Sequence, residues 1–163
     1  MNAHGAIRSA MTRSDFLVKG YLADLTDAEL LVRPVPGANH IAWQLGHLIV
    51  AEHKMVNAAS PGAMPSLPSG FAEKHVSDTA IIDDPGAFYT KEEYLRLYEQ
   101  QRAATLAALE KTSEADLDRP GPKATERLAP TVGDLFMLQG VHWSMHAGQW
   151  AVTRRKLGRK PLF

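Results

Sequence analysis

The chain has 163 residues and carries 18 acidic and 18 basic side chains, so its formal net charge is zero. This length fits one domain, which we expect to span residues 1–163, and the balanced charge gives no global field that attracts nucleic acid or an anionic membrane. The sequence contains no cysteine, which excludes disulfides, thiolate nucleophiles, iron–sulfur clusters and zinc sites with sulfur ligands.

Residues 1–10 contain no continuous apolar segment of the kind found in signal peptides. No stretch of the chain approaches the roughly 20 apolar residues that a membrane-spanning helix needs. The sequence therefore predicts a cytoplasmic protein with neither a membrane nor a nucleic acid as its partner.

The first part of the chain predicts two long helices separated by a turn. Apolar residues recur near the helical period of about 3.6 over residues 6–23 and again over residues 39–59. Between them, residues 25–31 have the pattern of a short capped turn. Asn39 is a good N-cap for the second helix.

The last part of the chain predicts two more helices. Thr90 with Glu93, and Thr131 with Asp134, have the spacing of a capping box. We therefore expect a helix to begin at each threonine, the first ending near residue 111 and the second near residue 157.

Two irregular connections link these helices. Residues 60–89 are rich in proline and glycine, with one helical turn expected at Phe71–His75, and the segment is long enough to cross over the bundle. Residues 113–130 form the second connection. With four amphipathic helices and no convincing strand, the sequence predicts an all-α fold, a four-helix bundle.

His142 and His146 are the strongest candidates for chemistry. They lie four residues apart in the last predicted helix, so their imidazoles share one face, about 5 to 6 Å apart at Cβ. His47, beside the inner stripe of the second helix, is the preferred third ligand. His40 lies roughly 10 Å from His47 along the axis and cannot share its ion, and His53 is expected to face solvent.

Three neutral imidazoles leave coordination positions open, which is typical of a catalytic metal site. Histidine nitrogens suit zinc and nickel best, with manganese or iron as further candidates. Such an ion can lower the pKa of a bound water or bind an incoming thiolate. No spacing singles out a general base, and the candidates are Glu52, Glu73 and Asp134.

Several further residues have more than one interpretation. Gln149 and Gln44 are candidates to orient a ligand or a water, although Gln149 suits a hydrogen bond between helices equally well. Gly46 would let another helix approach closely. The three tryptophans are expected in the core or at a dimer interface. The basic residues from Arg154 to Lys160 suit a solvated helix end better than a phosphate or nucleic-acid site.

Two motifs resemble those of the DinB-like (DinB/YfiT-like) metalloenzyme family. Residues 43–48 (WQLGHL) resemble its second-helix motif, and residues 142–150 (HWSMHAGQW) resemble its fourth-helix motif. The resemblance implies a four-helix bundle with up-down-down-up topology, a homodimer, and a divalent metal held by His47, His142 and His146. Relatives include transferases and isomerases that use low-molecular-weight thiols such as bacillithiol or mycothiol.

The leading hypothesis is therefore a small metal-dependent enzyme. It would act on a small-molecule substrate, either as a hydrolase or as a thiol-dependent S-transferase. The alternative is a non-catalytic metal- or ligand-binding helical bundle. A third hypothesis is a metal-free interaction module whose tryptophan-rich last helix forms a dimer face.

Overall fold

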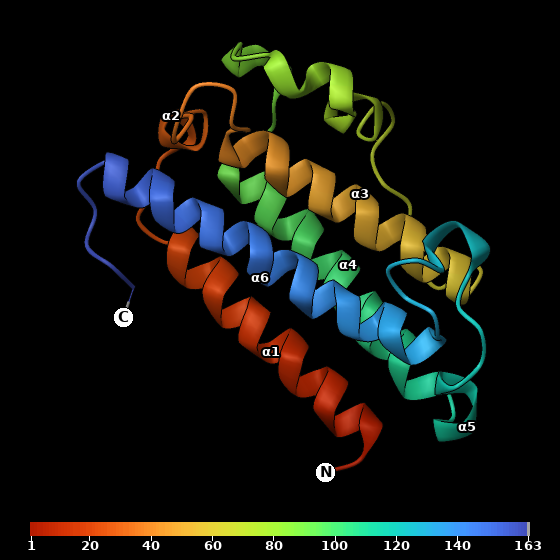
Figure 1. The fold of residues 1–163 in the computed structure, drawn as a ribbon. Coiled ribbons are helices and arrows are strands. Elements are labelled where there is room, and N and C mark those ends of the chain that lie inside the picture. The colour runs from red at the N-terminus through yellow and green to blue at the C-terminus, as the bar shows by residue number, and fades with distance from the viewer. Residues whose placement is uncertain (163) are drawn as a thin grey trace.

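A computed structural model describes residues 1–162, and the only extended pairing among them is an isolated bridge between Pro120 and Thr131. The predicted all-helical fold is confirmed. Its long helices are α1 (Ala3–Leu22), α3 (Ile41–Ala59), α4 (Lys91–Lys111) and α6 (Val132–Lys156) (Figure 1). Shorter turns of helix are α2 (Asp27–Leu30), α5 (Glu114–Leu117) and the 3-10 turn η4 (Lys123–Thr125).

Contacts between distant parts of the chain set the directions of the long helices. Arg154, near the end of α6, donates from Nη1 to the carbonyl of Tyr21, near the end of α1, at 2.9 Å, so these helices run the same way. Trp150, also near the end of α6, donates to Gln44 near the start of α3 at 2.8 Å, so α3 runs against α6. Helix α4 packs on α3 and runs alongside it in the same direction (Figure 1).

Capping side chains explain where the helices begin. Thr90 with Glu93, and Thr131 with Asp134, form complete capping boxes, as the sequence predicts. Each threonine hydroxyl accepts from the backbone of the acidic residue, whose carboxylate accepts from the threonine N–H. These interactions are local, which is why the sequence alone reveals them.

The predicted N-cap of α3 is wrong by one residue. His40 caps the helix instead of Asn39, and its Nδ1 accepts from the Trp43 N–H at 3.1 Å. The His40 ring is buried, and its Nε2 donates to the carbonyl of Ile82 at 2.9 Å. His40 therefore joins the start of α3 to the connection that follows the helix.

That connection, residues 60–89, returns along the outside of α3 to the start of α4 (Figure 1). It contains the 3-10 turns η1 (Glu73–His75), η2 (Ser77–Ile81) and η3 (Pro85–Ala87). The first of these confirms the predicted helical turn. Trp43 Nε1 donates to the carbonyl of Val76 at 3.1 Å and so ties the connection to α3.

The tryptophans lie in the core. Trp143 and Trp150 on α6 are 1% and 0% exposed, and the Trp143 ring lies 4.4 Å from the ring of Tyr98 between centroids. Trp43 is also buried. The tryptophans of α6 are therefore core residues and cannot themselves supply a dimer contact, because these side chains are already covered within the chain.

No helix in the described range combines the length and the apolar character that crossing a membrane requires.

Candidate metal centre

The structure brings together the three histidines that the sequence singles out. His47 lies on α3, and His142 and His146 lie one turn apart on α6. One ring nitrogen from each can be chosen so that all three lie within 4.8 Å of one another. The ring centroids are 5.0 to 5.6 Å apart, and each side chain is half-buried.

Helix packing places these rings. Helix α6 turns its apolar face inward through Trp143, Ala147 and Trp150. The two histidines lie at the edge of that face, where α6 meets α3. On the other side of the cluster the Trp43 ring stacks on His47, with centroids 5.0 Å apart and planes 8° from parallel. Because Trp43 is itself bonded to the 60–89 connection, this stack limits rotation of the His47 ring.

A buried amide sets the tautomer of His146. Gln44 Oε1 lies 2.8 Å from Trp150 Nε1 and 2.9 Å from His146 Nδ1. An indole N–H can only donate, so the Gln44 atom at this position must be the acceptor oxygen. His146 Nδ1 must then carry the proton, which leaves the Nε2 lone pair free. The amide nitrogen of Gln44 supports this orientation of the amide, because Nε2 donates to the carbonyl of Asn39 at 2.7 Å.

The site favours neutral imidazoles. Burial lowers the pKa of His47, and burial together with the neighbouring histidines lowers the pKa values of His142 and His146 to about 4. Among the described residues, none hydrogen-bonds to a ring nitrogen of His47 or His142. Their lone pairs are therefore available at neutral pH, which is what a metal ligand requires.

The other histidines have structural partners. His40 caps α3, and His53 is half-buried rather than solvated, with ring contacts to Gln101 at 3.1 Å and Asn57 at 3.2 Å. Sequence reasoning missed His75, which is buried in the 60–89 connection with Nε2 2.8 Å from the Tyr94 hydroxyl.

Gly46 is the one sequence signal for His75. The element that approaches Gly46 closely is the short 3-10 turn η1, through the ring of His75, and not one of the long helices. A Cβ at position 46 would lie 2.0 Å from His75 Cδ2. Only glycine therefore lets this ring lie against α3, one residue before His47.

None of the three candidate bases has a described interaction with the histidine cluster, and two of them have other partners. Glu52 is 1% exposed, and its carboxylate accepts from Thr105 and Trp143 at 2.7 Å each. Asp134 caps α6, and Glu73 is exposed. No interaction described for these carboxylates reaches the histidine cluster.

The two glutamines differ sharply. Gln44 is buried and bonds His146, as the prediction of an orienting role requires. Gln149 is exposed and has no hydrogen bond among the described residues. Its role in the site stays a prediction.

The donor set fits a divalent ion. Histidine nitrogens bind zinc at about 2.0–2.1 Å, so ligand atoms within 4.8 Å of one another need only small side-chain rotations to surround one ion. Three nitrogens would not fill a tetrahedral site, which leaves at least one position for a further ligand.

Comparison with known families agrees with this geometry. The model of the DinB superfamily matches residues 12–150, a range that includes all three histidines. No curated protein matches the chain.

Proposed function

The chain belongs to the DinB superfamily, and from this membership and the histidine cluster we propose that it is a small metal-dependent enzyme. His47, His142 and His146 would hold one divalent ion, with zinc or nickel favoured by the all-nitrogen donor set. The observation that carries the proposal is the convergence of three neutral imidazoles from two helices within 4.8 Å.

When bound, the ion supplies Lewis acidity and coordination positions open to water or a thiol. Neighbouring residues of the chain orient the histidine rings. Gln44 holds the proton of His146 on Nδ1, so that Nε2 is the nitrogen that would bind the ion. Trp43 holds the plane of the His47 ring by stacking. The proposed reaction is hydrolysis, or transfer of a low-molecular-weight thiol to a small-molecule substrate.

The proposal includes the family architecture. The helix directions described above support a single domain over residues 1–163, folded as a four-helix bundle with up-down-down-up topology. The exposed apolar side chains of Val141, Met145 and Val152 recur along one side of α6 and support a homodimer through that face. The predicted compartment is the cytoplasm.

Metal analysis tests the ligand set. The purified protein, reconstituted with zinc or nickel, should hold about one ion per chain. His47→Ala, His142→Ala and His146→Ala should each lose it and keep their helical circular dichroism. His53→Ala is the matched control, a half-buried histidine of α3 outside the cluster, and should keep the ion. Metal retained in the cluster variants, or absent from the reconstituted protein, would overturn the assignment.

A second assay tests for catalysis. The zinc- and nickel-loaded proteins are screened for hydrolysis of activated esters and amides and for conjugation of a small thiol to an electrophile. Turnover that His146→Ala abolishes is the expected result. Stoichiometric metal without turnover in either screen would favour a non-catalytic metal-binding bundle.

A further inference from the structure

A second site lies where the C-terminal segment folds back on α1 and α6. Gly158 ends α6 with a φ of 69°, a backbone conformation that favours glycine. Leu162 then packs against Gly20 of α1, where a Cβ would lie 2.8 Å from Leu162 Cδ2. Arg154 Nη2 lies 3.4 Å from the Lys160 carbonyl and helps to hold the segment in place.

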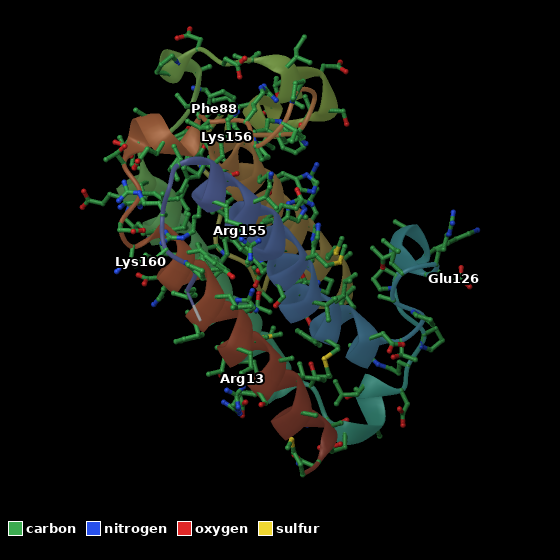
Figure 2. The ribbon with its side chains drawn as sticks, turned by 60° about the vertical axis from the view of Figure 1, so that its left-hand side comes forward. Arg13, Phe88, Glu126, Arg155, Lys156 and Lys160 are labelled. Carbon is green, nitrogen blue, oxygen red and sulfur yellow. The ribbon has the colours of Figure 1, made fainter. Side chains whose placement is uncertain are left out.

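The folded segment encloses a cavity of about 100 Å³. Its described lining includes four cationic side chains and no carboxylate: Arg154, Arg155, Arg159 and Lys160, with Tyr21, Ala151, Pro161 and Leu162. Arg154 is only 6% exposed, whereas Arg155 and Lys160 are exposed. Figure 2 shows Arg155 on the last turns of α6 and Lys160 on the segment that turns back beside it.

The charges around this cavity are unbalanced. Asp24 binds Arg154 through both oxygens and lies 3.6 Å from Arg159, which also pairs with Glu29 at 2.6 Å. Both carboxylates lie outside the lining. Within the described chain, neither Arg155 nor Lys160 has an ion-pair partner. The two carboxylates thus pair with Arg154 and Arg159 only, and the positive charges of Arg155 and Lys160 beside the cavity are not balanced by an ion pair.

The expectation of a solvated helix end is therefore wrong for Arg154. Its guanidinium is buried, with Nε lacking any hydrogen-bond acceptor among the described residues. Burying a guanidinium is costly, and the Asp24 carboxylate and the Tyr21 carbonyl hold this one in place. This pre-ordered cation distinguishes the site from a cluster of flexible surface charges.

We propose that this cavity binds a small oxyanion, a phosphate group that is either free or carried by a phosphate monoester. Guanidinium groups present planar pairs of donors that match phosphate oxygens. The cavity volume of about 100 Å³ is enough for a phosphate group. Arg154 follows His146 by eight residues, or about 12 Å along the helix axis, so the site is separate from the histidine cluster.

The test is a titration of the metal-free protein followed by two-dimensional proton–nitrogen NMR. The probes are inorganic phosphate, phenyl phosphate and, at matched ionic strength, sodium chloride. Phosphate should shift the Arg154 and Arg159 Nε–H signals and the Gly158 amide saturably, and chloride should not. Binding of inorganic phosphate alone identifies the free ion as the ligand, and equal or tighter binding of phenyl phosphate identifies a monoester.

Substitutions at the rim complete the test. Arg155→Gln/Lys160→Gln removes two cations without breaking a described ion pair and should weaken phosphate binding at least about tenfold. Arg13→Gln/Lys123→Gln is the control, because it makes the same charge change at exposed residues outside the lining; Arg13 is labelled in Figure 2. Equal weakening in both double variants would overturn the proposal, as would shifts caused by an oligonucleotide but by neither phosphate probe.

Discussion

Gln44 and His146 lie on different helices and are joined by one hydrogen bond of 2.9 Å. The same Gln44 oxygen accepts from Trp150, so a core tryptophan determines which nitrogen of His146 carries the proton. The orientation of one proposed ligand therefore depends on a residue of the opposite helix that binds no metal itself. Such supporting hydrogen bonds both orient a histidine ligand and raise its basicity.

Replacing Gln44 with methionine should affect both stability and metal binding. Gln44→Met removes the acceptor shared by His146 and Trp150 and leaves two donors unpaired. The free energy of unfolding should fall by about 1–3 kcal/mol. Zinc affinity, measured by competition with a chromogenic chelator, should fall about 10- to 100-fold.

Gln101→Met provides the matched control. Gln101 is also 1% exposed and bonds His53 and the carbonyl of Pro65, away from the histidine cluster. Its replacement should lower stability to a similar extent and leave zinc affinity unchanged. An equal loss of affinity in the two variants would show that Gln44 acts only through stability.

A pair of glycine substitutions tests the packing beside the site. Gly46→Ala would place a methyl group 2.0 Å from the His75 ring, so the ring must move and its 2.8 Å contact with Tyr94 must break. We expect the free energy of unfolding to fall by about 1–3 kcal/mol. Urea unfolding measures this change.

Gly148→Ala is the opposite case. Gly148 is exposed on α6, and a Cβ there would meet no described atom within 4 Å. Alanine in a helix interior should raise stability by about 0.5–1 kcal/mol. If the two substitutions changed stability equally, the contact between Gly46 and His75 could not be the cause.

A buried ion pair provides a third prediction. Arg102 Nη2 lies 3.1 Å from Glu52 Oε2, and their side chains are 4% and 1% exposed. Glu52→Gln leaves the positive charge of Arg102 with only one described ion-pair partner, the Asp15 carboxylate at 3.7 Å. The free energy of unfolding should fall by about 3–5 kcal/mol.

The double variant Glu52→Gln/Arg102→Met removes both charges. It should be clearly more stable than Glu52→Gln alone, because no unpaired charge remains buried. Urea unfolding of the two single variants and the double variant gives the coupling energy. A coupling near zero would mean that the two side chains act independently.

Local signals made much of the fold predictable. Thr90 with Glu93, and Thr131 with Asp134, lie within one helical turn, so the sequence alone locates the starts of α4 and α6. The spacing of His142 and His146 likewise places both on one face of a helix. His47 is different, because its position beside the inner stripe of its helix and the family resemblance favour it, whereas its approach to the other two histidines depends on how α3 packs against α6.

Apart from the N-cap of α3, the errors concern contacts between residues far apart in the chain. His75 packs on Gly46, Glu52 pairs with Arg102, and Arg154 pairs with Asp24. The residues that flank each of these polar side chains in the sequence are typical of a solvated surface. Whether it is buried depends on which element packs over it, and one-dimensional patterns do not encode that partner.

His4 provides a prediction on pH. Its Nδ1 lies 2.8 Å from a Glu114 oxygen, and its Nε2 lies 2.7 Å from the Thr112 carbonyl and 3.1 Å from that of Leu109. All three atoms are acceptors, so both ring nitrogens must donate, which requires the protonated imidazolium. The bond to Glu114, followed by the bonds to the carbonyls, raises the pKa of His4.

A raised pKa in the folded state means that the native protein binds the proton more tightly than the unfolded chain does. The contribution of His4 to stability is therefore complete below the unfolded pKa of about 6.5, and it is lost as the pH rises through the folded pKa. Urea unfolding between about pH 5.5 and pH 9 should show this decline. His4→Gln and Glu114→Gln should both flatten it, while Glu126→Gln, an exposed carboxylate in the connection before α6 (Figure 2), should not. An unchanged slope in His4→Gln would assign the decline to another group.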